Sequence, residues 1–313
     1  MSMHIYVSGS MAYDRIMDFP GKFSDHILPD KIHILNVSFT VNGMVEKFGG
    51  TAGNIAYSLS LLKENSVILA TIGKDHARYF DWLKGNGISA EGIKVIHEEF
   101  TAGAYITTDK ADNQITGFNP GSMKHQSGYK FNNVKPEDSI AVIAAGNLQD
   151  MIEYAATYKS RGINYICDPG QSLTSWEGKD LADWIKGSIM LISNDYELDM
   201  IMRKTGLDKK NLLKKTKTII TTLGEKGSVI STSEGDTSIP AAKIINILDP
   251  TGAGDAYRAG LVKGIVMGKD IETSAKIGAV AATYAIEHYG TQEHYYTYEN
   301  FVKRYKTNFG DLE

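Results

Sequence analysis

The chain has 313 residues, of which 42% are hydrophobic, so it can bury a sizeable core in one large domain with an appendage or in two domains. Its formal net charge is −4, which argues against a nucleic-acid-binding protein that relies on counterion release. Cys167 is the single cysteine, the eight histidines form no HExxH or Cys/His cluster, and no apolar run approaches membrane-spanning length. We therefore expect a soluble cytoplasmic protein with no internal disulfide, no zinc site and no membrane partner.

The first half of the chain predicts strands that alternate with helices, apart from two segments. A short β-rich run at His4 to Ser8 is the first expected strand. Helical spacing over Thr51 to Leu62 is followed by a strand-like run at Ser66 to Thr71, and Asp75 to Asn86 predicts another helix.

From about residue 140 the alternation becomes regular. A helix is expected from Asp150 to Arg161, with Gly162 as its stop. The expected strands around it are Ile140 to Ala145, Tyr165 to Cys167, Ile189 to Ser193 and Thr218 to Thr222. Apolar strands alternating with helices indicate βαβ units and a mainly parallel sheet covered on both faces. Val229 to Ser231 and the run to Leu248 suggest an antiparallel insertion, and the C-terminal third is expected to be helical.

Two segments, Ile16 to Val45 and Glu98 to Phe118, break this rhythm. They carry strand-like patterns at His33 to Val41, Ala104 to Thr108 and Gln114 to Phe118, with no helix between strands. We expect them to pair as a small separate sheet. Ligands of open α/β sheets bind at the carboxyl ends of the strands, so a small sheet folded over that edge would act as a lid.

The most informative motif is Asp249-Pro250-Thr251-Gly252-Ala253-Gly254-Asp255, which opens a predicted helix over Ala256 to Met267. Its glycines let backbone N–H groups approach a ligand, and the helix N-terminus favours negative charge there. Asp255 places a carboxylate beside this anion hole, which is the minimum needed to move a phosphoryl group onto a hydroxyl. The alternative is an ordinary Gly-rich turn followed by an acidic first helical turn.

A second Gly-rich element, Phe48 to Asn54, opens the helix expected from Thr51. Gly49 and Gly50 would let a ligand lie against the backbone, while Asn54 offers a donor and an acceptor. The alternative is a tight strand-to-helix turn capped by Asn54. Asp14, just beyond the first strand, is suited to accept hydrogen bonds from vicinal hydroxyls, or is simply a turn aspartate.

Two further elements follow predicted strands. Asn194-Asp195-Tyr196-Glu197 begins a helix, where Asn194 and Glu197 are suited to hold hydrated Mg²⁺, or to form a helix cap. Thr222 to Gly227 brings a hydroxyl and the bare backbone of Gly224 and Gly227 to a phosphate, or forms a hairpin turn. No GxxxxGK[ST] motif and no HRD or DFG set occurs, and the Gly252 motif lacks the third glycine of the dinucleotide fingerprint.

With these motifs in this order, the chain resembles the ribokinase-like (phosphofructokinase-B type) superfamily of sugar and nucleoside kinases. Gly49 to Asn54 resembles the first family signature and Asp249 to Asp255 the second. The resemblance implies a three-layer α/β/α sandwich with a mainly parallel central sheet and a small β-sheet lid. It places the catalytic core at 1–12, 46–97 and 119–313, and the lid at 13–45 and 98–118.

The resemblance also implies a role for each candidate residue. Asp255 would be the catalytic base, with the backbone of Gly252, Ala253 and Gly254 as the anion hole. The sugar hydroxyls of the acceptor would be bound by Asp14, Gly49, Gly50 and Asn54, and Mg²⁺ and phosphate would be held near Asn194 and Glu197. The ATP nucleotide would be bound by Thr222, Gly224 and Gly227. Family members often bind K⁺, which would be held here by Asp249 and Thr251, with a second half of that loop near 285–290.

Within the superfamily, several segments are most similar to bacterial adenosine kinases: His26 to Asp30, Ile115 to Met123, Asp168 to Gln171, and Asp249 to Thr251 with Arg258. An ATP-dependent kinase of the adenosine 5′-hydroxyl, active in purine salvage, is therefore the first expectation. A kinase of free ribose or fructose, and a non-catalytic ligand-binding relative, are the alternatives. We expect a monomer or a homodimer formed through the lid.

Two further assignments follow from the same resemblance. Arg258, one helical turn beyond Asp255, is a candidate contact for the transferred phosphoryl group, with a surface arginine as the alternative. Phe19, Phe39, Phe118 and Met123 are candidates for an apolar slot for the base, with ordinary lid packing as the alternative.

Overall fold

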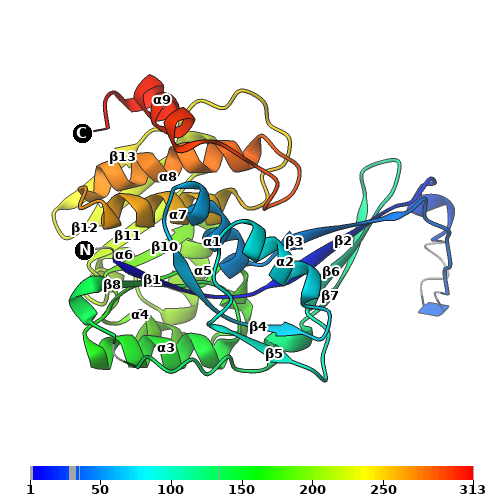
Figure 1. Ribbon diagram of the computed structural model, residues 1–313, viewed down its shortest axis with the longest axis horizontal. Coiled ribbons are helices and arrows are strands. Elements are labelled where there is room, and N and C mark those ends of the chain that lie inside the picture. The colour runs from blue at the N-terminus through cyan, green and yellow to red at the C-terminus, as the bar shows by residue number, and fades with distance from the viewer. Residues whose placement is uncertain (1–2, 28–32, 35, 133, 313) are drawn as a thin grey trace.

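The larger sheet of the protein has nine strands in the order β13-β12-β11-β10-β9-β8-β1-β4-β5 (Figure 1). The structure is a computed structural model that describes residues 3–27, 33–34, 36–132 and 134–312. Neighbouring strands from β5 to β11 are parallel, and β12 and β13 add an antiparallel edge. The strands are β1 His4–Ser8, β4 Ser66–Gly73, β5 Ile93–Ile96, β8 Ser139–Ile143, β9 Asn164–Cys167, β10 Met190–Asn194, β11 Thr218–Thr222, β12 Ser228–Thr232 and β13 Gly235–Ile239.

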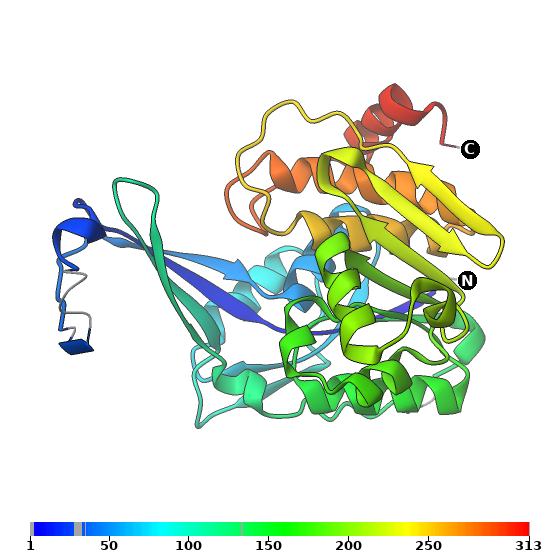
Figure 2. The same cartoon turned by 180° about the vertical axis from the view of Figure 1, so that it is seen from behind.

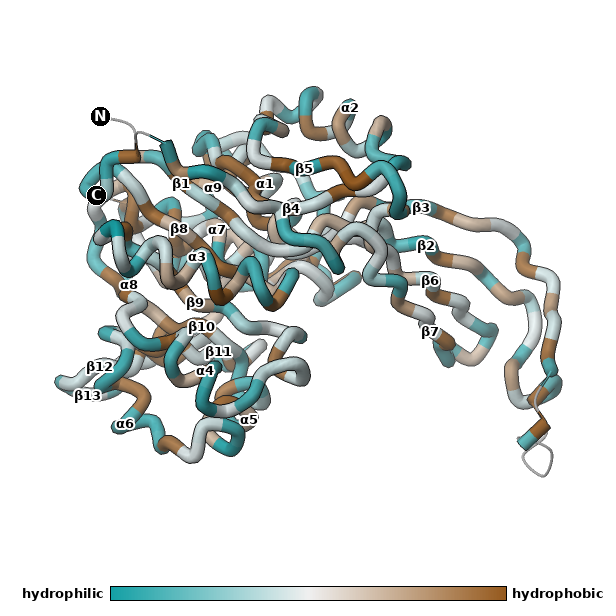
Figure 3. The backbone as a smooth tube through the Cα atoms, turned by 90° about the horizontal axis from the view of Figure 1, so that it is seen from below, coloured by the Kyte–Doolittle hydropathy of each residue, from teal (hydrophilic) through white to brown (hydrophobic). Residues whose placement is uncertain are grey.

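Helices cover both faces of this sheet (Figures 1 and 2). One core contains buried side chains of α1, α7, α8 and α9, and the other contains those of α3, α4 and α5. Successive residues of the central strands β1 and β8 contribute to the two cores in turn, so these strands bury hydrophobic side chains on both faces. Figure 3 colours each residue of the chain by its hydropathy. The helices are α1 Thr51–Leu61, α2 Ala77–Gly85, α3 Leu148–Arg161, α4 Gly178–Ile185, α5 Asp195–Thr205, α6 Lys209–Leu212, α7 Ala253–Val266, α8 Ile271–Ile286 and α9 Tyr298–Phe309.

The expected parallel α/β architecture is thus confirmed, and local chemistry explains several boundaries. Asn147 caps α3 by accepting from the Asp150 N–H, and Gly162 ends the helix in the left-handed conformation. Short 3₁₀ helices complete the connections: η1 Phe23–Asp25, η3 Gly121–Lys124, η4 Pro136–Asp138, η5 Gly170–Ser175 and η6 Gly224–Lys226. Throughout the described residues, every helix is too short or too polar to cross a bilayer.

The smaller sheet projects from one end of the molecule (Figures 1 and 2). Its order is β3-β2-β6-β7, with bounds β2 Ala12–Asp18, β3 Met44–Gly49, β6 Ala102–Thr108 and β7 Gln114–Asn119. Two of its strands were expected at 104–108 and 114–118, and the structure confirms both. The expected domain boundary at residue 45 falls inside β3, all of which pairs with β2 in this sheet.

The strand expected at His33 to Val41 is wrong. Residues 33–34 form a 3₁₀ turn, residues 36–41 form no strand, and Leu35 lies outside the described residues. The edge of β2 is instead taken by β3, which pairs from Ala12 with Gly49 to Met17 with Met44 and leaves no free β2 edge for an earlier segment. Of the segment His26 to Asp30, residues 28–30 also lie outside the described residues.

The apolar run that ends at Leu248 is also not a strand. The antiparallel insertion closes at Ile239, where β13 ends. The backbone N–H groups of Leu248 and Asp249 both donate to the carbonyl of Ile286 at the end of α8, at 2.9 and 3.1 Å. This attachment to a helix end replaces strand pairing and leaves Ile245 84% exposed.

An aromatic cluster closes the distal end of the smaller sheet. The ring centroids of Phe19 and Phe39 are 4.5 Å apart, and Phe23 lies 5.5 Å from both. Phe19 and Phe23 are buried in this cluster. Phe19 and Phe39 are therefore ordinary packing residues of this sheet rather than part of a slot for a base.

The helices α7 and α8 meet along a seam of small residues. A Cβ atom at Gly260 would lie 2.7 Å from the Cα of Gly278, and one at Gly264 would lie 2.5 Å from the Cα of Ser274. Both distances are shorter than real Cβ contacts, so only glycine permits this backbone approach. The seam fixes α7, whose first turn carries the Gly252 motif, against the following helix.

Candidate active site

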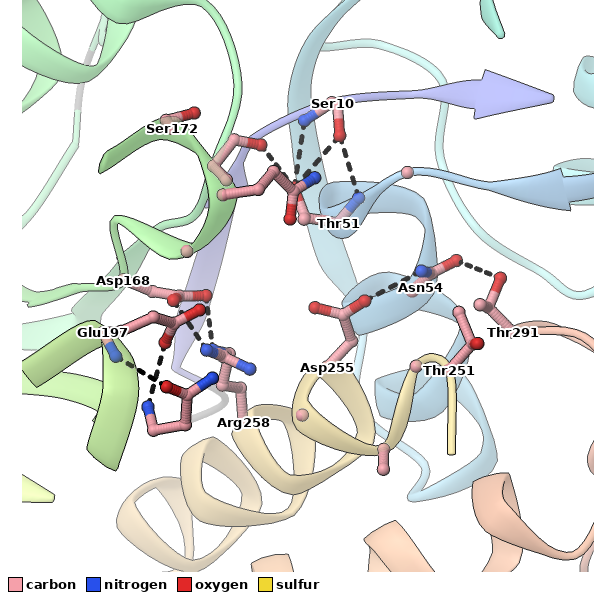
Figure 4. Close-up of a pocket in the computed structure, with 18 of the residues that line it drawn as sticks. Ser10, Thr51, Asn54, Asp168, Ser172, Glu197, Thr251, Asp255, Arg258 and Thr291 are labelled. Atoms are coloured by element: carbon pink, nitrogen blue, oxygen red, sulfur yellow. Dashed lines mark hydrogen bonds and ion pairs between the residues drawn. The ribbon is translucent and has the colours of Figure 1, made fainter. Parts of the chain in front are cut away.

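A cavity of about 990 Å³ lies where the carboxyl ends of the parallel strands meet the base of the smaller sheet. It is lined from the N-terminal turns of α1 and α7, from the ends of β1, β8, β9, β10 and β11, and from β2, β6 and β7. Figure 4 shows the polar side chains that face one another across it. The structure thereby brings together most of the residues singled out from the sequence: Asp14, Gly50, Asn54, Asn194, Glu197, Thr222, Gly224, Thr251, Gly252, Ala253, Gly254, Asp255 and Arg258.

The Gly252 motif forms the N-terminus of α7, as the sequence predicts. Gly252 is the N-cap residue and has a φ of 80°, which glycine adopts without strain. The Ala253 N–H is used internally, because it donates to the Pro250 carbonyl at 3.2 Å. The N–H groups of the first turn have no acceptor within a helix, and the helix dipole adds positive potential at this end. The turn therefore presents a positive end to the cavity.

Asp255 lies in the first turn of α7 with its carboxylate facing the cavity (Figure 4). One carboxylate oxygen, Oδ2, accepts a hydrogen bond of 2.8 Å from Asn54 Nδ2. Burial raises the pKa of Asp255, while the Arg258 guanidinium and the Asn54 hydrogen bond act in the opposite direction. A carboxylate with a raised pKa next to the positive end of a helix has the chemistry of a general base.

The first Gly-rich element turns from β3 into α1. Asp14 is not the turn aspartate of the alternative interpretation, because it lies within β2 and lines the cavity. Burial, and to a lesser degree the charge of Asp249, raise the pKa of Asp14. Gly49 is not among the described residues that line the cavity, and it lies against the Asp14 carboxylate. Asn54 is 5% exposed and bonds Asp255 instead of capping α1.

Gly50 is held in a conformation that other residues rarely adopt, with a φ of 91°. A Cβ atom there would lie 2.6 to 2.7 Å from the backbone of Ser10, Met11 and Ala12. We expect Gly50→Ala to lower the free energy of unfolding by at least about 2 kcal/mol, measured by denaturant titration. Gly85→Ala is the matched control, since it has open space around it and a helical backbone and should cost nothing. Equal stability of the two variants would contradict this account.

Arg258 is not a surface arginine. Its guanidinium forms an ion pair with both carboxylate oxygens of Asp168, at the end of β9, and one of these bonds, from Nη2, is 2.6 Å. The Asp168 side chain is 2% exposed and that of Arg258 12%. The guanidinium lines the cavity beside Gly254, so a positive charge is fixed next to the N-terminus of α7.

The elements after β10 and β11 form the helix cap and the hairpin turn that their sequences allow, and some of their residues also line the cavity. Asn194 and Glu197 form a reciprocal capping box on α5, with bonds of 2.7 and 2.9 Å, and both residues also line the cavity. Residues 222–227 form the hairpin turn between β11 and β12, and Thr222 and Gly224 face the cavity. Gly227 is not among the described residues that line the cavity, because its backbone packs against Ile239.

Asp249 lies just outside the described cavity lining and connects two loops. Its carboxylate accepts from the N–H groups of Thr251 at 2.9 Å and Gly290 at 3.0 Å. Burial opposes the charge, but these hydrogen bonds and the nearby Lys47 together lower the pKa of Asp249. The structure therefore places the expected second half of this loop, 285–290, beside the first.

A family model settles the relationship of this site to known proteins. The model of the pfkB family carbohydrate kinases matches residues 12–297. The chain belongs to this family. It is therefore a phosphotransferase with an alcohol group as acceptor, and the pfkB family places its fold in the ribokinase-like class expected from the sequence.

Several known kinases are similar to this chain over most of its length. The nucleoside kinase of Methanocaldococcus jannaschii is 34% identical over 272 residues, covering 86% of this chain and 89% of the relative. The ligand-free nucleoside kinase of Burkholderia thailandensis has a TM-score of 0.86 and 36% identity, covering 96% of this chain and 99% of its own. The same kinase was solved with inosine, with a TM-score of 0.85 and 35% identity, covering 98% of this chain and 98% of its own. It was also solved with ADP-inosine, with a TM-score of 0.83 and 36% identity, covering 98% of this chain and 96% of its own. Fructokinase-2 of Oryza sativa subsp. japonica is 28% identical over 241 residues, covering 70% and 71%.

Some residues of this pfkB-family site were not assigned from the sequence. Asp168 was noted only as part of the segment Asp168 to Gln171, which is similar to adenosine kinases. An aspartate directly after a buried strand is nevertheless a sequence signal for a site residue. Thr291 and Gln292 carry no such signal, because they lie in a loop after α8, about 240 residues from Asn54. Their side chains nevertheless donate to Asn54 Oδ1 at 2.8 and 3.0 Å.

Proposed function

We propose that this chain is an ATP-dependent nucleoside kinase that transfers the γ-phosphoryl group to the 5′-hydroxyl of a purine nucleoside, with adenosine as the acceptor indicated by the sequence. The observation that carries the proposal is the position of Asp255 beside the N-terminus of α7, in one cavity with Asp14 of the smaller sheet. The similarity to nucleoside kinases, one of them solved with inosine, supports a nucleoside as acceptor. The reaction would serve purine salvage in the cytoplasm.

In this proposal Asp255 accepts the proton of the 5′-hydroxyl as the oxygen attacks the γ-phosphorus. Asn54 holds Oδ2 of the carboxylate, which leaves Oδ1 for the acceptor hydroxyl. The first-turn N–H groups of Gly252 and Gly254 stabilise the charge that develops on the transferred group, since they are already oriented before the reaction. The expected Ala253 donor is not available, because its N–H donates to the Pro250 carbonyl. Arg258 adds a fixed positive charge beside them.

The acceptor would lie between the smaller sheet and α1. Asp14 is the candidate acceptor of hydrogen bonds from the ribose hydroxyls, and the backbone of Gly50 and the second hydrogen on Asn54 Nδ2 complete that side. Phe118 on β7 and Met123 in η3 both line the cavity, and Phe118 is 55% exposed. These two apolar side chains are the candidates for contact with the base.

The nucleotide would lie toward the ends of β10 and β11, against Thr222 and Gly224. The chemistry of Asn194 and Glu197 fits Mg²⁺, because both offer oxygen atoms at a solvent-accessible cavity wall. Among the described residues, no group of three His, Cys, Asp or Glu side chains could hold a metal ion, which suits an ion held mainly by water and phosphate oxygens. When bound, Mg²⁺ would neutralise charge on the ATP phosphates.

A monovalent cation is proposed at the loop of Asp249 and Thr251. The carboxylate of Asp249 stays ionised between two loop segments, which is the charge that K⁺ requires nearby. The ion would add positive potential close to the anion hole. Turnover measured in potassium against a tetramethylammonium salt at equal ionic strength tests this assignment.

The acceptor is tested with a panel of adenosine, inosine, ribose and fructose, with ATP as donor. We expect kcat/KM for the preferred purine nucleoside to exceed that for ribose at least about tenfold, because binding energy from the base can be used at the reacting centre. A higher value for ribose or fructose would replace the nucleoside kinase by a sugar kinase, the alternative that the fructokinase similarity supports. No turnover of any acceptor would favour a ligand-binding relative.

The smaller sheet is proposed as a lid that closes over the acceptor and excludes water from the phosphoryl group. Arg15 on β2 connects it to the core through Asp75, at 3.1 Å, and to Glu46 on β3, at 2.8 Å. We expect adenosine to raise hydrogen-exchange protection together in 12–18, 44–49 and 102–119, with little change in β8. Protection confined to 222–227 would mean that adenosine binds at the nucleotide position.

A further inference from the structure

A chain of buried and partly buried hydrogen bonds leads from Asp255 away from the cavity. Asn54 Nδ2 donates to Asp255, and Asn54 Oδ1 accepts from Gln292 Nε2 at 3.0 Å. Gln292 Oε1 in turn accepts from the indole Nε1 of Trp82, on α2, at 2.9 Å. Four side chains that are distant in sequence are thus connected in one direction, from an indole N–H to a carboxylate.

The direction of this chain is set at Trp82. The two ends of a glutamine or asparagine amide have nearly the same shape, so either could face a given neighbour. The indole N–H of Trp82 can only donate, so it requires the oxygen of Gln292 to face it. The Gln292 NH₂ group then faces Asn54, which requires Oδ1 of Asn54 there and leaves Nδ2 for Asp255.

Thr291 cannot set this orientation by itself. Its hydroxyl has one hydrogen and lies within reach of two acceptors, Asn54 Oδ1 at 2.8 Å and the Phe48 carbonyl at 3.0 Å. Gln292 has two N–H hydrogens, one for Asn54 and one for the Tyr79 hydroxyl at 2.7 Å. Gln292 is therefore the donor that remains committed to Asn54.

Burial makes this orientation persistent. Gln292 is 1% exposed and Tyr79 is fully buried, so water does not compete for their hydrogen bonds. Gln292 is also outside the cavity lining among the described residues. Its side chain contacts the cavity wall through Asn54, which does line the cavity.

We propose that Gln292, oriented by Trp82, is a positioning residue that fixes the Asn54 amide with its N–H toward Asp255, so that one carboxylate oxygen is held and the other is free for the acceptor hydroxyl. The proposal rests on the proposed function, in which Asp255 is the base. Without Gln292 the Asn54 amide can rotate and present its oxygen to the carboxylate, which repels it.

The other groups near Asp255 do not replace this contact. The charged groups that face it are Arg258 on its own helix, Asp168 at the end of β9 and Glu197 on α5, and the buried Tyr79 hydroxyl is also near. Arg258 is already paired with Asp168. The Asn54 N–H is therefore the neutral donor that lowers the pKa of Asp255 against the effect of burial.

The test compares Gln292→Met with wild type, using ATP and whichever of adenosine and inosine is turned over faster. We expect kcat to fall roughly tenfold, the usual size for a hydrogen bond to a charged group, with KM for ATP unchanged. The acid limb of the kcat/KM profile should move up by about one pH unit, because the carboxylate loses a donor. Trp82→Phe should also lower kcat and raise the pH of the acid limb, but by less. If Gln292→Met does not fold, Trp82→Phe is the variant that tests the inference.

Tyr79→Phe is the matched control. It removes a hydroxyl that accepts from Gln292 and donates to the Gly49 carbonyl at 2.7 Å, in the same buried cluster, but leaves the bond from Gln292 to Asn54. We expect no shift of its acid limb. A shift as large as that of Gln292→Met, or an unchanged profile in both Gln292→Met and Trp82→Phe, overturns the inference. Retained activity in Asp255→Asn would instead overturn the role of Asp255 as the base in the proposed function, whatever the profiles of the other variants.

Discussion

Replacing Asp255 with asparagine is expected to reduce kcat by roughly 10²- to 10⁴-fold, the usual contribution of a general base. The substitution preserves shape, and the new amide oxygen can still accept from Asn54, so the cavity should keep its geometry. What is lost is the ability to accept the proton of the acceptor hydroxyl. Steady-state kinetics with ATP and the preferred nucleoside provide the measurement.

The pH profile supplies an independent check on the same residue. The base acts in its ionised form, and burial raises the pKa of Asp255, so wild-type kcat/KM should fall on the acid side as pH drops through that raised pKa. Asp255→Asn should lack this limb in its residual activity. Nucleotide affinity, measured by calorimetry with ADP, should change little. Near-normal turnover in the variant would remove Asp255 from the mechanism.

Removing Arg258 is expected to lower the stability of the protein strongly. The Asp168 carboxylate is 2% exposed, and Arg258→Met would leave it buried without its partner. Breaking a buried ion pair from one side costs about 3–5 kcal/mol. We therefore expect a loss of this size in the free energy of unfolding, measured by denaturant titration at pH 8, together with a loss of activity.

A second substitution separates the buried charge from lost packing. In the double variant Arg258→Met with Asp168→Asn, no charge is left without a partner, so most of the lost stability should return. Activity should not return, because the positive charge beside Gly254 is still missing. If single and double variants are equally unstable, the loss arises from packing and the ion pair is not its cause.

Much of the fold could be predicted because its signals are local. The strand at 218–222 was placed at its exact bounds, and Asn147, Gly162 and Gly252 end or begin helices by chemistry that a sequence shows. The prediction of a strand at 33–41 was wrong because the alternation of apolar residues there resembles that of a strand. In the structure, the aromatic side chain of Phe39 packs at the end of the sheet. Strand pairing there was decided by β3, a competition that no local pattern reports.

The residues of the candidate site were likewise predictable where their signals are local and not predictable where they depend on the fold. Asp255, Asn54 and Asp14 lie in motifs whose spacing indicates their chemistry, and the structure brings all three to one cavity. Gln292 and Trp82 were not predicted, because each is an ordinary residue until the fold places them in contact, 210 positions apart. Residues that orient a catalytic group from behind it have this character in general: their identity depends on three-dimensional neighbours.

The small-residue seam between α7 and α8 has a consequence for how the protein is made. Each glycine within α7 costs about 1 kcal/mol of helix propensity relative to alanine, and Gly254, Gly260 and Gly264 together make α7 a weak helix in isolation. Much of its stability must come from packing in the fold, against α1 and above all against α8, which ends at Ile286. During synthesis, therefore, the N-terminal turn of α7 becomes stable only after α8 has left the ribosome, and this wall of the cavity is completed late in folding.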